Sequence, residues 1–126
     1  MKEIRLSDSE WKVMTALWRG APKTITQLVA ALKAENGWSK STVITLLKRM
    51  EAKGAVRYEE GERARRYFPN AGKEQLSLQE TENFMDKVFG GSVGLMMSAL
   101  VDGKGISAAE LDELQALLDR AREEET

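Results

Sequence analysis

The stretch WSKSTVITLLKRMEAK, residues 38–53, has the pattern of a short helix with one apolar face. Ser39 can cap its start, because a serine hydroxyl accepts a hydrogen bond from an unpaired backbone N–H of the first turn. Apolar residues then recur at i, i+3, i+4 and i+7, the spacing of one helix face: Val43, Leu46, Leu47 and Met50. We therefore predict a helix from Ser39 to about Lys53.

The opposite face of this helix carries no acidic residue. At about 100° per residue, it holds Ser41, Thr45, Lys48 and Ala52, with Ile44 and Arg49 on its flanks. Short hydroxyl side chains can reach base edges in a DNA major groove, and cations can reach phosphates. The same residues also suit an ordinary solvated helix face, so the surrounding sequence has to decide.

The composition excludes several classes of protein. The chain has 126 residues, enough for one medium or two small domains, and it contains neither cysteine nor histidine. Disulfides are therefore excluded, as are Ser–His and Cys–His nucleophile pairs, and a zinc or copper site lacks its preferred ligands. No Gly-rich phosphate loop is present either. We expect no metal, no cofactor and no enzymatic activity.

No apolar run approaches the roughly 20 residues that span a bilayer, and the N-terminal MKEIRLSDSE lacks the apolar core of a signal peptide. We expect a cytoplasmic protein with no membrane insertion. The net charge of −1 hides an asymmetry, because residues 1–72 carry +6 and residues 73–126 carry −7. Such a division predicts a first part that faces a polyanion and a second part with another task.

Two further helices precede the opening stretch. Ser7 and Glu10 form a capping-box pattern ahead of a helix from about Asp8 to Arg19, and Thr24 or Thr26 starts a second helix that ends near Glu35. Asn36-Gly37 is a turn signal between the second and third helices. Three helices with this tight connection predict a helix-turn-helix.

A β-hairpin follows the third helix. Residues 55–59 and 63–69 read as strands around a turn at residues 60–62, which predicts the wing of a winged helix. The wing carries three arginines, Arg63, Arg65 and Arg66, which suit contacts with DNA phosphates. Three glutamates in the same hairpin favour the alternative, an exposed edge kept soluble by its charge: Glu59, Glu60 and Glu62.

Beyond Gly72 the chain is acidic and helical. We predict helices from about Lys73 to Phe89, from Ser92 or Gly94 onward, and from Ser107 to about Glu123. Residues 73–126 are too few to bury their own apolar faces, so we expect a second copy to cover them. The alternative is that they pack back on the N-terminal half as one monomeric core. The candidate dimerisation residues are Phe84, Met85, Val88, Phe89, Leu95, Met96, Leu100, Leu111, Leu114 and Leu118.

The chain resembles the penicillinase repressors of the BlaI/MecI/CopY type. The matching segments are LSDSEWKVMTALW at 6–18, GWSKSTVITLLKRMEAKGAV at 37–56, RRYFP at 65–69, NFMDKVFGGSVGLM at 83–96 and ISAAELDELQALL at 106–118. The resemblance implies a dimeric winged-helix repressor that binds a palindromic operator in double-stranded DNA. Relatives often have Pro then Lys where Lys40 and Ser41 stand, and some carry a basic residue at the position of Ile44.

The resemblance also bears on regulation. Copper-sensing members use Cys-x-Cys pairs, which this chain lacks. β-Lactam-responsive members are cut by a membrane metalloprotease at an Asn–Phe bond, and that bond aligns with Ala99–Leu100, which is a different dipeptide. The implied partners are therefore operator DNA, a second copy and a membrane metalloprotease.

The predicted fold is mainly α with a small β wing: an N-terminal winged helix-turn-helix domain, residues 1–72, and a C-terminal three-helix dimerisation arm, residues 73–126. The predicted function is sequence-specific repression of transcription, and the alternative is a winged-helix adaptor that binds proteins and never DNA. The candidate DNA-binding residues are Lys40, Ser41, Thr42, Ile44, Thr45, Lys48, Arg49, Arg63, Arg65, Arg66 and Tyr67.

Overall fold

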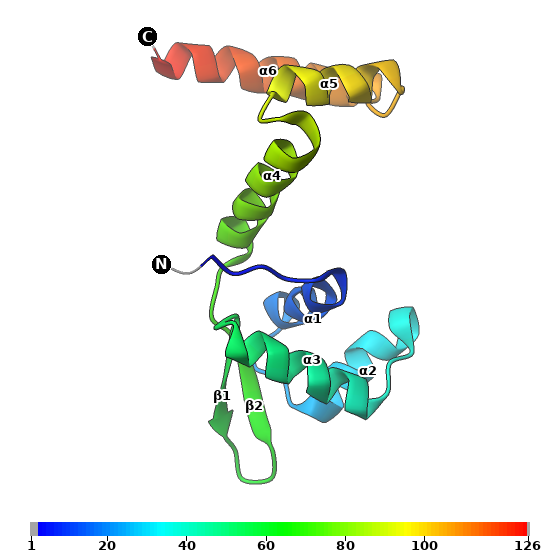
Figure 1. The fold of residues 1–126 in the computed structure, drawn as a ribbon, viewed down its shortest axis with the longest axis vertical. Helices are drawn as coiled ribbons and strands as arrows, with labels where there is room; N and C mark the ends of the chain where they lie inside the picture. The colour runs from blue at the N-terminus through cyan, green and yellow to red at the C-terminus, as the bar shows by residue number, and fades with distance from the viewer. Residues whose placement is uncertain (1–2, 126) are drawn as a thin grey trace. The chain divides into compact units, whose positions relative to one another are not determined.

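The computed structural model describes residues 3–125. Helices and strands follow one another along the chain as the sequence predicts (Figure 1): α1 Asp8–Arg19, α2 Ile25–Asn36, α3 Lys40–Ala52, β1 Val56–Glu60, β2 Arg65–Pro69, α4 Lys73–Phe89, α5 Val93–Asp102 and α6 Ala108–Glu125. The chain divides into two compact units, residues 1–80 and residues 81–126. The predicted fold class, mainly α with a small β wing, is confirmed.

Side-chain caps fix the helix starts that the sequence predicted. In each capping box a hydroxyl accepts from the backbone three residues on, and the Glu or Gln there accepts from the cap's own N–H. The pairs are Ser7 with Glu10, Thr24 with Gln27, and Ser107 with Glu110. Ser39 caps α3 in a simpler way, by accepting from the backbone N–H of Thr42 at 3.3 Å.

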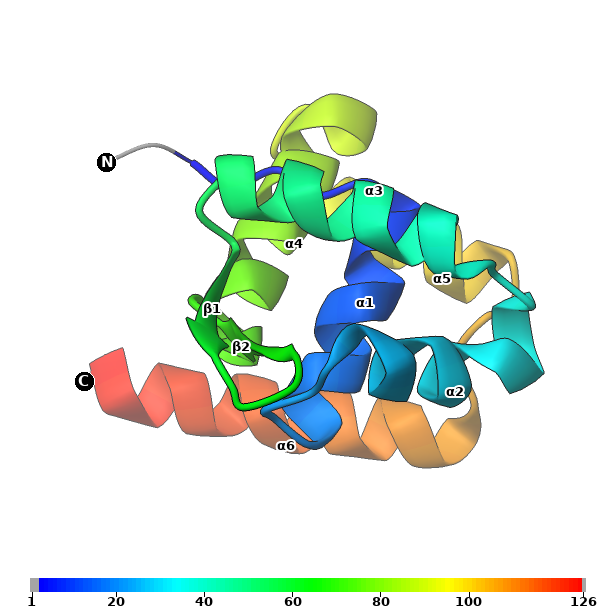
Figure 2. The ribbon, with the colours of Figure 1, turned by 90° about the horizontal axis from the view of Figure 1, so that it is seen from below.

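The core of the first unit lies between α1, α2, α3 and the hairpin. Figure 2 shows α1 between α2 and α3, with the hairpin beside them. The apolar face predicted for α3 is buried, and Met14 and Leu17 of α1 meet it. Trp11 and Trp18 lie at the edge of the core with their ring centroids 5.6 Å apart. Gly37 joins α2 to α3 at φ 61°, a left-handed conformation that favours glycine.

The wing is an antiparallel pair in which Val56 faces Pro69 and Glu60 faces Arg65. At its turn, the backbone N–H of Gly61 donates to the carbonyl of Ala64 at 3.1 Å. A Cβ at Gly61 would lie 2.4 Å from that oxygen, so the turn needs glycine. The backbone of Lys23 adds a short bridge to the outer side of Tyr67 in β2.

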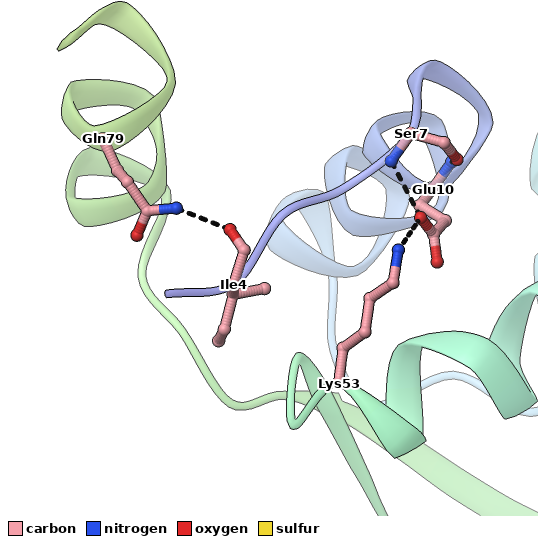
Figure 3. Close-up of polar contacts among 5 residues, drawn as sticks. All are labelled: Ile4, Ser7, Glu10, Lys53 and Gln79. Carbon is pink, nitrogen blue, oxygen red and sulfur yellow. Dashed lines mark hydrogen bonds and ion pairs between the residues drawn. The ribbon is translucent and has the colours of Figure 1, made fainter. Parts of the chain in front are cut away.

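An ion pair connects the start of α1 to the residue that follows α3 (Figure 3). The Lys53 ammonium donates to Glu10 Oε1 at 2.6 Å, and the backbone N–H of Ser7 donates to the same oxygen at 2.8 Å. The Glu10 side chain is 1% exposed, while that of Lys53 is 38% exposed. The sequence indicated Glu10 only as a capping residue, so its burial and its distant partner were not foreseen.

Two opposing effects set the pKa of Glu10. Burial raises it, but hydrogen bonds from Lys53 and Ser7 stabilise the carboxylate and hold the pKa below its ordinary value of 4.5. The ionised carboxylate therefore contributes stability that is present above about pH 4.5 and is lost as the pH falls through the lower folded-state value.

The first turns of α4 belong to the N-terminal unit. Leu76 is buried in its core, and the Gln79 side-chain amide donates to the carbonyl of Ile4 at 2.6 Å (Figure 3). Trp18 Nε1 also donates to the carbonyl of Ala71 at 2.9 Å, just before α4 begins. The division between the units consequently falls after Glu80, within α4, whereas the sequence placed the domain boundary at Gly72.

The second unit leaves most of its apolar side chains exposed. Neither α5 nor α6 contains a buried residue. Of the candidate dimerisation residues, Met85 is buried, Phe89, Met96 and Leu114 are half-buried, and the others are 41% to 61% exposed: Phe84, Val88, Leu95, Leu100, Leu111 and Leu118. Among residues 3–125 no single helix is long and apolar enough to cross a membrane, and one pair, α4 with α5, reaches the length and composition only across a 79° bend.

Glu10→Gln should lower the free energy of unfolding of the N-terminal unit by about 2 kcal/mol at pH 7, because a charge-assisted hydrogen bond from a partly exposed Lys53 is lost. Glutamine can still accept from the Ser7 backbone, so the cap itself survives. Urea unfolding followed by tryptophan fluorescence reports this unit, since Trp11, Trp18 and Trp38 all lie in it.

The difference between the native chain and the Glu10→Gln variant should shrink as the pH falls below about 4.5, the ordinary value that applies to the unfolded chain, and through the lower pKa of Glu10 in the folded state. Glu35→Gln, the same substitution at an exposed site of α2, is the control and should change stability far less at either pH. An equal effect of the two substitutions at pH 7 would contradict the role given to the ion pair.

Candidate nucleic-acid interface

The outer face of α3 lies open to solvent, as predicted. Five of its candidate residues are exposed, and two are half-buried, Thr42 and Ile44. The exposed residues are Lys40, Ser41, Thr45, Lys48 and Arg49. Within residues 3–125, none of the three cations of this face has a carboxylate partner in an ion pair. Their charges are therefore available to an anionic partner.

Hydroxyl groups gather at the N-terminal end of this face. Ser39 Oγ lies 3.0 Å from Ser41 Oγ and 3.1 Å from Thr42 Oγ1. The Thr45 hydroxyl donates to the Ser41 backbone carbonyl at 2.9 Å. Because the hydroxyl proton of Thr45 is used within the helix, this residue offers an outside partner an oxygen acceptor and a methyl group.

A groove of about 360 Å³ connects α3 to the wing. Lys40, Ile44, Lys48 and Glu51 form its α3 side, and Ala64, Arg65 and Tyr67 form its wing side. Cations from two separate elements therefore border the same groove, although Arg65 lies far from α3 in sequence.

The start of α2 supplies a third side of this groove, through Ile25 and Thr26. Neither residue is among the DNA-binding candidates predicted from the sequence. A signal was present, because Thr26 is an exposed hydroxyl residue in the first turn of a helix, where backbone N–H groups are unpaired and attract anions.

The arginines of the wing differ in their ion pairs with neighbouring glutamates. Arg65 Nε lies 3.1 Å from Glu60 Oε1, and the Arg65 guanidinium stacks 4.1 Å above the Tyr58 ring. Glu59 holds two arginines, with Arg57 Nη1 at 3.2 Å and Arg66 Nη2 at 3.9 Å.

Arg63, by contrast, has no carboxylate partner among the residues that the structure describes. The glutamates that the sequence raised as an objection to a phosphate-binding wing thus neutralise two of its three candidate arginines, Arg65 and Arg66, and leave Arg63 unpaired.

Tyr67 is placed differently from the other candidates. It is 5% exposed, its ring centroid lies 5.8 Å from that of Tyr58, and its backbone pairs with that of Lys23. Its side-chain hydrogen bond with Arg65 raises the pKa of that guanidinium. Tyr67 therefore supports the wing from within the core and presents only a small exposed part to the groove beside α3.

Among the described residues, no group of three or more His, Cys, Asp and Glu side chains is placed to hold a metal ion. A helix-turn-helix, a following β-hairpin, and free cations and hydroxyls on the third helix instead define a winged-helix DNA-binding protein. The acidic helical residues 81–126 form a second compact unit.

Comparison with known proteins gives the family. The family model described as penicillinase repressor matches residues 6–120, and the chain belongs to that family of DNA-binding transcriptional repressors. It is 23% identical to the methicillin resistance regulatory protein MecI of Staphylococcus aureus, over 94% of this chain and 97% of that protein. It is 26% identical to the penicillinase repressor of Bacillus licheniformis, over 94% of each chain.

A solved structure is similar to the N-terminal part. The Bacillus licheniformis repressor BlaI, in monomeric form in complex with the blaP half-operator, is 31% identical and covers 59% of this chain and 92% of that one, with a TM-score of 0.51. The winged-helix fold and the family predicted from the sequence are thus confirmed.

Glu59→Gln should strengthen DNA binding, because it releases Arg57 and Arg66 for phosphates. Glu62→Gln is the control, since Glu62 lies in the same hairpin, removes the same charge and has no ion-pair partner among the described residues. We expect about a tenfold gain from Glu59→Gln and about a twofold gain from Glu62→Gln at 100 mM salt, measured by fluorescence anisotropy. Equal gains would mean that the ion pairs do not restrain the arginines.

Proposed function

We propose that this protein represses transcription by binding a palindromic operator as a homodimer, in the cytoplasm, with one winged helix on each half-site. The proposal rests on the outer face of α3, where cations that have no carboxylate partner among the described residues flank a cluster of short hydroxyl side chains. Such a surface fits the DNA major groove, where hydroxyls and methyl groups can read bases while cations hold phosphates.

The roles of the residues follow from their positions along α3. Four residues of the N-terminal half face the base edges: Ser41, Thr42, Ile44 and Thr45. Ile44 and the methyl group of Thr45 suit the methyl group of thymine. Lys40, Lys48 and Arg49 border these four residues and bind phosphates on either side of the DNA major groove.

The three candidate arginines of the wing contribute unequally to DNA binding. Arg63 is the readiest phosphate contact because no glutamate within residues 3–125 pairs with it, whereas Arg65 and Arg66 must first exchange Glu60 and Glu59 for a phosphate. Arg65 borders the groove beside α3, and its stacking on Tyr58 holds the guanidinium in place for that exchange. Thr26 at the start of α2 is a further phosphate contact.

Dimerisation is supported by the apolar side chains of the second unit. Leucine, valine and phenylalanine side chains there are 41% to 61% exposed, and neither α5 nor α6 contains a buried residue. Burial of apolar surface stabilises by roughly 25 cal/mol per Å², so a second copy of the same helices is a favourable cover for them. Joining two winged helices then makes the second half-site contact intramolecular and raises the overall affinity.

Relief of repression through the arm fits the same arrangement. Cutting the dimerisation helices would leave single winged helices, which lose the gain from two half-sites. The Ala99–Leu100 bond aligns with the Asn–Phe bond that is cut in β-lactam-responsive members, although the dipeptide differs, and it lies within α5. The Ala99 carbonyl accepts from the N–H of Gly103 at 3.0 Å, and the Leu100 carbonyl accepts from the N–H of Gly105 at 2.8 Å. Cleavage there therefore requires the last turn of α5 to open first.

Leu118→Glu tests the dimer. Leu118 in α6 and Leu78 in α4 are both 61% exposed, but Leu78 lies in the N-terminal unit and outside the proposed interface. Sedimentation should show a monomer for Leu118→Glu, with operator affinity lower by about a hundredfold, and a dimer for Leu78→Glu. A dimeric Leu118→Glu chain with normal affinity would rule out the proposed interface.

Thr45→Ala tests the assignment of base contacts. It should reduce the preference for operator over shuffled DNA by about tenfold, because one apolar or hydrogen-bonding base contact per half-site is lost. Arg63→Ala should weaken binding to both DNAs by a similar factor, since a phosphate contact carries no sequence information. The division of roles would fail if Thr45→Ala weakened both DNAs equally.

A further inference from the structure

A second groove lies between α1 and α2. Its volume is about 250 Å³. Ala31, Leu32 and Glu35 of α2 border it, whereas Ile25 and Thr26 border the groove beside α3. The two grooves share no lining residue, so the second groove is distinct from the groove of the proposed DNA interface.

The charges around this groove are mostly of one sign. Lys12, Arg19 and Lys23 line it, and none of them has a carboxylate partner in an ion pair within residues 3–125. Glu35 lines it as well and reduces the local balance to about +2. The Lys12 ammonium instead lies 5.9 Å from the centroid of the Trp38 ring.

The floor of the groove is apolar. Ala16 and Leu32 line it and are both buried in the N-terminal unit. A bare phosphate or sulfate would gain nothing from this floor, whereas a ligand with a hydrocarbon body would cover it. Cations at the rim and apolar atoms below them together favour a molecule with one anionic end and one apolar end.

We propose that the groove between α1 and α2 binds a small organic carboxylate whose body is an aromatic ring or a short hydrocarbon. The volume lies just below the roughly 300 to 1,000 Å³ of drug-sized ligand sites, so the ligand is about the size of a single ring with its carboxylate. Arg19 and Lys23 hold the carboxylate, and Ala16 and Leu32 contact the body. No role in DNA binding is needed for this site to exist.

Lys23 connects this groove to the wing. Its backbone N–H donates to the carbonyl of Tyr67 at 3.2 Å, and its carbonyl accepts from the N–H of Tyr67 at 2.8 Å. A ligand held by the Lys23 side chain is therefore one hydrogen-bonded residue away from strand β2, which carries Arg65 and Arg66.

The test is a titration of the full chain with benzoate, followed by the amide signals of an NMR spectrum at constant ionic strength. Acetate has the same charge without the ring and is the comparison ligand. We expect saturable shifts at groove residues with benzoate, and binding of acetate weaker by about tenfold because the apolar floor is left uncovered.

Three variants locate the site. Arg19→Gln should weaken benzoate binding by about tenfold, and Glu35→Gln should strengthen it by a few fold, because the first removes a partner and the second a repelling charge. Lys33→Gln, an exposed lysine of α2 that does not line the groove, should leave the affinity unchanged.

Two outcomes would overturn the proposal. One is equal binding of benzoate and acetate with no difference between Arg19→Gln and Lys33→Gln, which would indicate only diffuse charge attraction. The other is no benzoate shift at the groove together with a large loss of DNA affinity in Arg19→Gln, which would make these cations DNA contacts. The DNA-binding proposal itself stands or falls with α3 and is not tested by the benzoate titration.

Discussion

The buried carboxylate of Glu10 is the constraint on which the arrangement of the N-terminal unit depends. Removing a carboxylate from water is costly unless it is paired and hydrogen-bonded, so Glu10 is stable only where Lys53 and Ser7 can both reach it. Lys53 directly follows α3, and Ser7 caps α1. The ion pair thus fixes the end of α3 against the start of α1, and with it the direction in which the outer face of α3 points.

The outer face of α3 and the wing both carry the positive charges of the proposed interface, but they differ in how many of these charges are paired. On α3, Lys40, Lys48 and Arg49 are unpaired among the described residues, whereas Arg65 and Arg66 in the wing are held by Glu60 and Glu59. Affinity should therefore come chiefly from α3 and from Arg63 at the wing. The paired arginines are already held in place, so less side-chain entropy is lost when they bind. They must break an ion pair to bind phosphate, however, so they should bind best to DNA that already fits α3.

The sequence predicted those parts of the fold that depend on local pattern. The capping boxes, the apolar stripe of α3 and the turn at Gly61 are set by residues within a few positions of one another, and each is confirmed. Burial of Glu10 and Tyr67, and the ion pairs of Glu59, depend instead on side chains brought together by packing or strand register. Likewise, the packing of Leu76 on the first unit could not be predicted from the change in composition at Gly72.

The central claim is that α3 and the wing bind DNA through phosphates as well as bases. It is tested most directly by equilibrium binding of the full chain to DNA from upstream of its own gene, and to a shuffled duplex, between about 50 and 200 mM salt. Four phosphate contacts per protomer in a dimer predict that log K falls linearly with log salt, with a slope of about −7, and that upstream DNA binds more tightly throughout. A flat salt response, or equal affinity for the two duplexes, would contradict the account.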